Sequence, residues 1–197
     1  MFTGIIEAVG EIKKVASLES GIRIEVAPGR LDLCDVSISD SIAANGVCLT
    51  ITALVGGMIA MEVSRETLNC TQGLNIQGQR VNLEKAMRLS DRVGGHLVSG
   101  HVDGIGKVVK FEPAGESCLL AIKAPVLMLK YIAKKGSIAV NGVSLTVNWI
   151  AKDEFRVNLV PHTLAKTTLQ DLKPDTKVNL EVDMLARYIE QLLTASK

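Results

Sequence analysis

The stretch NGVCLT at residues 45–50 occurs a second time, with one substitution, as NGVSLT at residues 141–146. An Asn-Gly pair in front of alternating residues is a strong local signal for a tight turn between antiparallel strands. After each glycine, apolar residues alternate with small polar ones, which is typical of a strand with one buried face. The sequence therefore predicts the same hairpin twice.

The repetition extends outward from these two stretches. At the same offset of 96 residues (141 minus 45), SIA at 41–43 matches SIA at 137–139. Further on, VNLE at 81–84 matches VNLE at 178–181 at an offset of 97 (178 minus 81). One register over so much of the chain indicates two copies of one domain.

A polar, Gly-rich stretch, SDRVGGH at 90–96, separates the copies. We expect an N-terminal domain over residues 1–96, a C-terminal domain over 97–183 and a tail over 184–197. Within each copy, short alternating segments and frequent turns favour an all-β fold, either a small antiparallel barrel or a sandwich. The turn signals are Asn45-Gly46, Gly56-Gly57, Asn141-Gly142 and Pro174-Asp175.

Short helical turns are expected around Leu31 and Leu127, at matching places in the two copies. The tail is different, because its apolar residues recur at the spacing of one helix face, with Asp183 placed as N-cap. That face needs a partner, which is either the protein's own barrels or the same helix in other subunits. The residues of the face are Leu185, Ile189, Leu192 and Leu193.

Composition excludes several classes of function. The 22 basic residues nearly balance the 21 acidic ones, so no nucleic acid partner is expected. No apolar run is long enough to span a bilayer, and the N-terminus lacks the basic segment of a signal peptide. We therefore expect a cytoplasmic protein with no membrane partner. Its four cysteines form no CxxC pair and are expected to be free thiols.

The two copies differ at reactive side chains. Cys48 matches Ser144, and both point away from the core face of their strands. These positions are either solvated strand faces or ligand walls that differ in the reactive atom. His101, in the segment GGHLVSGHVDG at 94–104, matches Ile5; read as a strand residue, it is either an edge histidine or a general acid–base. No metal site is expected, because His96 and His101 fit no common zinc motif.

Several segments together resemble the riboflavin synthase family. They are MFTGII at the start, the ANGVCLT and VNGVSLT pair, GGHLVSGHVDG, KGSIAVNG, and VNLEVD before the tail. The resemblance covers essentially the whole chain. It implies two six-stranded antiparallel Greek-key barrels and a C-terminal helix that assembles a homotrimer with active sites between subunits.

The resemblance also implies a reaction. Two molecules of 6,7-dimethyl-8-ribityllumazine exchange a four-carbon unit and give riboflavin and 5-amino-6-(D-ribitylamino)uracil, with no cofactor or metal. A dismutation needs two copies of one molecule in opposed roles, and a duplicated binding domain supplies two similar sites. Much of the rate enhancement can then come from orientation.

The family's motifs, matched position by position, nominate binding residues in both copies. For the N-terminal site they are Gly4, Ile5, Ile6, Cys48, Leu49, Thr50, Glu62, Val63, Ser64, Arg65, Glu66 and Thr67. For the C-terminal site they are Gly100, His101, Val102, Ser144, Leu145, Thr146, Asn158, Leu159, Val160, Pro161, His162 and Thr163. Lys135 matches a residue that is contributed to a neighbouring subunit's site.

Phe2, Ser41, Cys48, His101 and Asp183 are the positions expected to react. We expect His101 to transfer the proton lost from the C7 methyl group of one lumazine. Cys48, or a water that it positions, would add at C7 of the other lumazine or only shape the pocket. Asp183 would orient His101 or a ribityl hydroxyl across the subunit interface.

Two alternatives belong to other classes of protein. Lumazine proteins of luminous bacteria share the duplicated fold but hold a chromophore as an optical antenna, and they resemble the synthase with an eroded second site. Cys48 and the segments GHLVSGHV and VNGVSLTV are intact here, which argues against erosion. A structural trimer without ligand would leave the differences between the copies unexplained.

Overall fold

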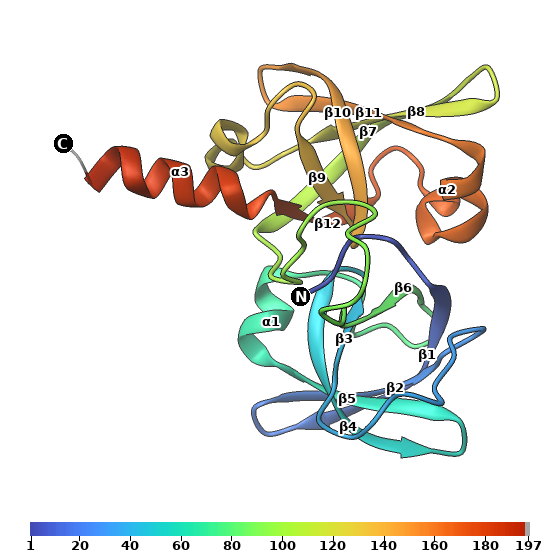
Figure 1. The fold of residues 1–197 in the computed structure, drawn as a ribbon. Helices are drawn as coiled ribbons and strands as arrows, with labels where there is room; N and C mark the ends of the chain where they lie inside the picture. Colours follow the sequence, from blue (N-terminus) through green and yellow to red (C-terminus); the bar gives the residue numbers. More distant parts are fainter. Residues whose placement is uncertain (196–197) are drawn as a thin grey trace.

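The computed structural model describes residues 1–195, which form two closed six-stranded antiparallel barrels and a projecting C-terminal helix (Figure 1). In the first barrel the strands are hydrogen-bonded in the closed order β1-β2-β5-β4-β3-β6. A short helix, α1 (Arg65–Cys70), lies in the connection between β5 and β6. The strands are β1 (Ala8–Leu18), β2 (Gly21–Ala27), β3 (Ser41–Ala44), β4 (Val47–Val55), β5 (Met58–Ser64) and β6 (Arg80–Lys85).

The second barrel repeats this topology with the closed order β10-β11-β8-β7-β12-β9. Its connections contain the helix α2 (Pro161–Lys166) and the 3₁₀ helices η1 (Val126–Tyr131) and η2 (Thr168–Asp171). The predicted all-β class and the pair of barrels are confirmed. The strands are β7 (Gly104–Ala114), β8 (Ser117–Lys123), β9 (Ser137–Val140), β10 (Val143–Ala151), β11 (Glu154–Leu159) and β12 (Lys177–Val182).

Each barrel buries its own apolar core. In β4, Val47 and Leu49 are buried, whereas Cys48 is half-buried and Thr50 is exposed. The equivalent residues of β10 follow the same alternation, as the sequence predicts. Removal of these apolar side chains from water is the main force that closes each barrel.

The Asn-Gly turns lie where the two barrels meet. Gly46 and Gly142 both have positive φ values, of 77° and 81°, which glycine adopts without strain. A Cβ on Gly46 would lie 2.6 Å from the main-chain nitrogen of Gly142. Two amides cross the contact: Asn82 Nδ2 donates to the Asn141 carbonyl at 2.9 Å, and Asn179 Nδ2 donates to the Asn45 carbonyl at 3.0 Å.

The N-terminal segments of the two repeats pair with each other. Phe2 N donates to Val98 O at 2.7 Å, and Val98 N donates to Phe2 O at 3.0 Å. Phe2 and Val98 are the same position of the repeat (98 minus 2 is 96). Self-pairing of equivalent positions is the signature of a two-fold interface, here between the two halves of one chain.

Two local predictions are wrong. The segment around His101 is not a strand, because it contributes only the single bridge at Val98 and then turns at Gly100, whose φ is +79°. The stretch around Leu31 forms turns and no helix. Asp32 Oδ1 accepts the Cys34 main-chain N–H at 3.0 Å, a local bond that competes with a helical turn. The predicted turn around Leu127 is present as η1.

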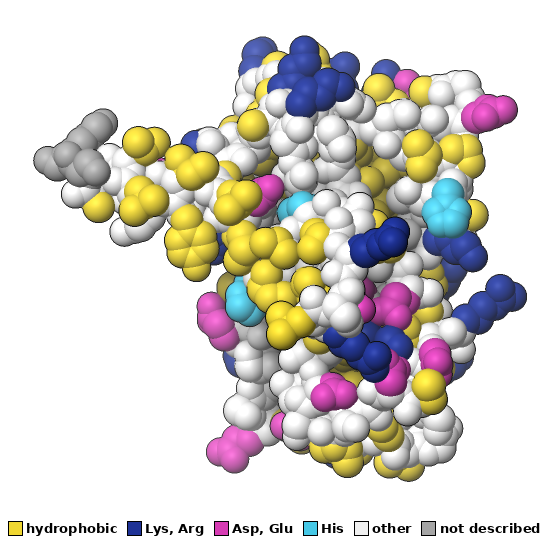
Figure 2. All heavy atoms as spheres, viewed as in Figure 1, with side chains coloured by type: hydrophobic (Ala, Val, Ile, Leu, Met, Phe, Trp, Pro, Cys, Tyr) yellow, Lys and Arg dark blue, Asp and Glu magenta, His cyan; other side chains and the backbone are white. Residues whose placement is uncertain are grey.

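The C-terminal helix α3 (Met184–Ala195) starts as predicted, with Asp183 Oδ1 accepting the Leu185 main-chain N–H at 3.0 Å. The alternative in which its apolar face packs on the protein's own barrels is wrong. Leu185, Ile189 and Leu193 are each more than half exposed, and yellow side chains run along the projecting helix (Figure 2). Ion pairs from α3 to Asp103 and Lys130 hold it to the second barrel.

All four cysteines are free thiols, as expected. Within residues 1–195, no helix is both long and apolar enough to cross a membrane.

Candidate functional site

A cavity of about 190 Å³ at the first barrel collects six of the nominated residues. They come from three places in the chain: the start of β4, the helix α1, and the segment that precedes β7. Their side chains offer a thiol, an imidazole, a carboxylate and a hydroxyl around one space. The lining residues are Val47, Cys48, Glu66, Thr67, Cys70, Thr71, Gly100, His101 and Val102.

One wall of this cavity belongs to the second repeat. Gly100 O accepts the Cys48 main-chain N–H at 2.8 Å, and Val102 packs against the core of the first barrel. A Cβ on Gly100 would lie 2.6 Å from Cys48 Cβ, so only glycine lets the two backbones approach this closely. His101 follows directly and is exposed at the cavity.

The second barrel has the mirrored arrangement. Gly4 O accepts the Ser144 main-chain N–H at 2.8 Å, and Ile6 packs against the core of the second barrel. The predicted grouping is therefore wrong. Gly4 and its neighbours border Ser144 and not Cys48, because the two N-terminal segments cross over after the Phe2–Val98 pair.

His96 lies beside Ser144, and the first repeat has no counterpart of this histidine. Ser144 Oγ and His96 Nδ1 are 2.7 Å apart, and His96 is buried. Its Nε2 is buried and has no hydrogen-bond partner among residues 1–195. Burial lowers the pKa of the His96 imidazole, and the negative charge of Asp183 offsets part of that shift. The ring is therefore neutral near pH 7 and can accept a proton.

The thiol of Cys70 lies on the opposite wall of the first cavity. Cys70 Sγ donates to Glu66 Oε1 at 3.4 Å. This hydrogen bond raises the pKa of the Cys70 thiol, which stays protonated at neutral pH. Cys70 is therefore not suited to act as a thiolate nucleophile in this cavity.

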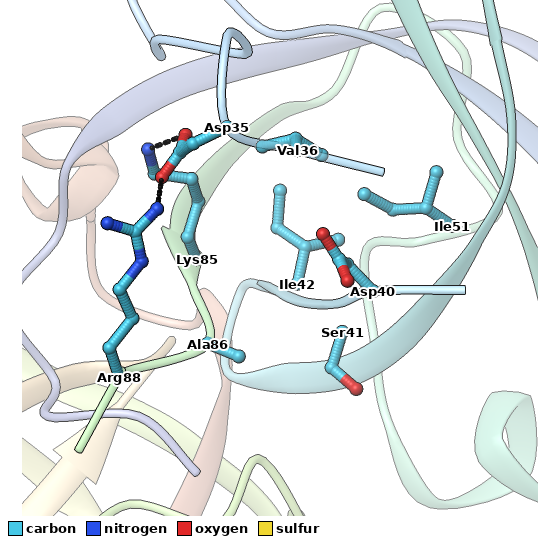
Figure 3. Close-up of a pocket in the computed structure, with 9 residues that line it drawn as sticks. All are labelled: Asp35, Val36, Asp40, Ser41, Ile42, Ile51, Lys85, Ala86 and Arg88. Carbon is cyan, nitrogen blue, oxygen red and sulfur yellow. Dashed lines mark hydrogen bonds and ion pairs between the residues drawn. The ribbon is translucent and has the colours of Figure 1, made fainter. Parts of the chain in front are cut away.

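Two of the five positions expected to react lie elsewhere. Phe2 is fully buried between the barrels, in a cluster with Val98. Ser41 lines a separate cavity of about 280 Å³ (Figure 3). There Asp35 pairs with Lys85 Nζ at 2.7 Å and with Arg88 Nη2 at 2.6 Å. The hydrogen bond from Lys85 lowers the pKa of Asp35.

Asp183 lies beside the second barrel's pair. Its side chain caps α3, and its charge acts on His96. Among the contacts described within one chain, Asp183 makes no hydrogen bond to His101, so its orienting role toward His101 or a ribityl hydroxyl across a subunit interface stays a prediction.

The remaining nominated residues divide by burial. Some belong to the barrel cores, where only their main chain can face a ligand: Leu49, Val63, Leu145 and Leu159. Others stand on exposed strand or turn positions: Thr50, Glu62, Lys135, Thr146 and Asn158. The rest lie where β5 passes into α1 and where β11 passes into α2: Ser64, Arg65, Val160, Pro161, His162 and Thr163.

Among residues 1–195, no group of three or more His, Cys, Asp or Glu side chains is arranged to hold a metal ion.

Both repeats match one family model, the lumazine binding domain, over residues 3–86 and 99–183. Riboflavin synthase of Photobacterium phosphoreum is 48% identical over 100% of this chain and 91% of that protein. Riboflavin synthase of Mycobacterium tuberculosis H37Rv is 41% identical over the whole of both chains. The chain belongs to the riboflavin synthase family. It is an enzyme on the strength of several such relatives, including riboflavin synthase of Bacillus subtilis at 37% identity.

Solved structures share the fold. LumP complexed with 6,7-dimethyl-8-(1'-D-ribityl) lumazine superposes with a TM-score of 0.83, covering 92% of this chain and 99% of LumP at 24% identity. LumP complexed with riboflavin gives a TM-score of 0.85 over the same shares. At this identity the likeness establishes the duplicated barrel architecture of this family member and nothing finer.

Sequence analysis missed His96 as a site residue in this member of the family. The residue lies in the linker and has no counterpart in the first repeat. The feature of the sequence that could have indicated His96 is the glycine before it, Gly95. Gly95 passes Ser144 so closely that a Cβ would lie 2.8 Å from Ser144 Oγ.

Proposed function

We propose that the protein catalyses the dismutation of two 6,7-dimethyl-8-ribityllumazine molecules. A four-carbon unit passes from one molecule to the other, and the products are riboflavin and 5-amino-6-(D-ribitylamino)uracil. The atoms of two substrates equal those of the two products, so no oxidant, reductant or further co-reactant takes part. Membership of the riboflavin synthase family supports this reaction.

The observation that carries the proposal is the crossed pair of walls. Gly100 borders Cys48, and Gly4 borders Ser144, through equivalent hydrogen bonds of 2.8 Å. The scaffold is thus the same at both places, whereas the reactive groups differ. Two equivalent places with unequal chemistry suit a reaction in which one compound acts both as donor and as acceptor.

The residues are assigned different tasks. In the first cavity, His101 takes the proton lost from the C7 methyl group of one lumazine, and Cys48 contacts C7 of the ring or the water that adds there. At the second barrel, the neutral His96 accepts a proton through Ser144, whose hydroxyl is within hydrogen-bond reach. Asp183 favours the protonated imidazole of His96 once it forms.

Assembly as a homotrimer through α3 is part of the proposal, together with active sites that span two subunits. The exposed apolar side chains of Leu185, Tyr188, Ile189 and Leu193 support it. Apolar residues on one side of a helix this short are stabilised when they pack against a partner. A trimer would bring the first barrel of one subunit to the second barrel of the next.

The test is incubation of the purified protein with 6,7-dimethyl-8-ribityllumazine alone, while absorbance follows both compounds. We expect riboflavin to appear at half the rate at which lumazine disappears. Tight binding without turnover would contradict the proposal and would identify an antenna or storage protein. Absence of binding would contradict both functions.

A further inference from the structure

Two buried carboxylates, one in each barrel, occupy the same position of the repeat and hold the crossed segments. Glu84 in β6 is 4% exposed and Glu181 in β12 is 3% exposed. They are 97 residues apart (181 minus 84), the offset that also aligns the surrounding VNLE motifs. Neither faces a basic side chain in the described hydrogen bonds and ion pairs, so burial raises the pKa of both carboxyl groups, and main-chain and hydroxyl donors offset part of that shift.

Glu181 fixes the segment that forms the wall of the first barrel's cavity. Its Oε1 accepts the Ser99 main-chain N–H and the Ser99 hydroxyl, both at 2.6 Å, and its Oε2 accepts the Gly100 N–H at 2.9 Å. The carbonyl of the same Gly100 accepts the Cys48 N–H at 2.8 Å. A single residue, Gly100, therefore links this carboxylate of the second barrel to the Cys48 backbone of the first through two hydrogen bonds.

Glu84 makes the matching contacts for the other side. Its Oε1 accepts the Thr3 N–H at 2.6 Å and the Thr3 hydroxyl at 2.7 Å, and its Oε2 accepts the Gly4 N–H at 3.0 Å. Gly4 O then accepts the Ser144 N–H. Each carboxylate thus clamps its own barrel's segment, and that segment completes the site of the other barrel.

We propose that Glu181 is a positioning residue for the Cys48 cavity, and that Glu84 is a positioning residue for the Ser144–His96 pair. The inference deepens the proposed function and rests on it for its catalytic meaning. Both carboxylates are buried, and the role assigned to them needs no contact with substrate. Each acts through a glycine whose carbonyl sets the place of the reactive strand and, for Glu181, through the His101 backbone that follows.

A glutamine in either place has nearly the same shape but opposes one N–H of the clamped segment with its own NH₂ group. The segment is then released on one side only. A role limited to general stability would disturb both sites alike. The cross-barrel role predicts instead that each substitution disturbs the site of the barrel to which the substituted residue does not belong.

The experiment compares Glu181→Gln with Glu84→Gln in the full-length protein. The readout is the rate at which iodoacetamide alkylates Cys48, measured by mass spectrometry of the Cys48 peptide without any ligand. We expect Glu181→Gln to raise this rate by about fivefold, the equivalent of one hydrogen bond, and Glu84→Gln to leave it within about twofold. Equal effects of the two substitutions, or a larger effect of Glu84→Gln, would overturn the proposal.

A second reporter reverses the comparison. In a Cys48→Ser, Ser144→Cys protein, the thiol at the second barrel should respond to Glu84→Gln and not to Glu181→Gln. If a glutamine variant does not fold, Ser99→Ala and Thr3→Ala remove one hydroxyl donor each from the two clamps and must show the same crossed pattern. The proposal would be contradicted if the thiol at residue 48 responded to Glu84→Gln, or the thiol at residue 144 to Glu181→Gln.

Alkylation needs no lumazine, so this result is independent of turnover. If the protein made no riboflavin but showed the crossed pattern, the proposed function would be disproved, whereas the positioning roles of Glu84 and Glu181 would be supported. When turnover is present, the lumazine concentration that half-protects Cys48 should rise in Glu181→Gln and stay unchanged in Glu84→Gln.

Discussion

His96 Nδ1 lies 2.7 Å from the hydroxyl of Ser144, the residue that takes the place of Cys48 in the second repeat. The first barrel has no histidine at the equivalent place, and its cavity receives His101 instead. Each reactive side chain thus has an imidazole in its neighbourhood, but His96 comes from the linker and His101 from the start of the second repeat. His101 is exposed, whereas His96 is buried and its burial lowers the pKa of its imidazole.

Burial of His96 predicts a pH-dependent stability. A lowered pKa means that the unfolded chain binds a proton more readily than the folded chain. The stability that comes from keeping His96 neutral is fully present above the ordinary pKa of 6.5 and is lost as the pH falls through the lowered pKa of the folded state. We expect the free energy of unfolding in urea to decline less between about pH 7.5 and pH 5 in His96→Asn than in the wild type. His162→Asn, at an exposed histidine, should keep the wild-type slope; equal slopes for all three proteins would contradict the assignment.

Gly100→Ala is expected to destabilise the fold through a steric clash in addition to backbone strain. Its new Cβ would meet Cys48 Cβ at 2.6 Å and Phe2 Cε2 at 2.9 Å. The matched control is Gly115→Ala, because Gly115 has a similar φ of +65° and open space around the Cβ position. We expect a loss of about 1 kcal/mol for the control, from the left-handed conformation, and about 1–3 kcal/mol more for Gly100→Ala, from overpacking. Urea denaturation measures both, and similar losses would show that the Cys48 contact yields easily.

Cys48→Ser and His101→Gln test the tasks assigned in the first cavity. Each removes a reactive group with little change in size, and we expect kcat to fall by at least about tenfold in each. Cys34→Ser, at an exposed thiol outside the cavity, should keep the wild-type kcat. If neither cavity substitution reached a tenfold effect, orientation of the two lumazines would account for most of the rate enhancement.

Ile189→Lys tests assembly through α3. Ile189 is 57% exposed in the single chain, and a charge there opposes burial of the helix face in a trimer. We expect light scattering after gel filtration to give a trimer for the wild type and monomers for Ile189→Lys, with a parallel loss of riboflavin formation. Gln191→Lys adds the same charge two residues along, on the other side of the helix, and should remain trimeric. A trimeric Ile189→Lys protein would place the subunit contact elsewhere.

Local sequence patterns make three features predictable: the duplication, the strands and the turns. Val47 and Leu49 alternate with polar residues, and Asn45 and Gly46 fix the turn before them. The all-β class follows from such segments. The stretch around Leu31 shows the limit, since one Asp side chain outweighs a helical tendency there.

The crossing of the N-terminal segments is not predictable in this way. Gly4 O accepts a hydrogen bond from the Ser144 N–H and not from the Cys48 N–H, although the two strands have almost the same sequence. Local sequence is equally compatible with either partner, so tertiary placement decides. The misplacement of Gly100 and His101, and the omission of His96, follow from this single cause.

The exchanged walls also restrict how the two halves of the sequence can diverge. A substitution at residue 48 is tolerated or rejected according to what stands at 100 and 101, in the other copy, and a substitution at 144 according to 4 and 5. The side chains that fit at residues 48 and 144 therefore depend on residues of the other half of the chain. The cysteine that matches Ser144 and the histidine that matches Ile5 lie in the same cavity, although they come from different halves of the chain.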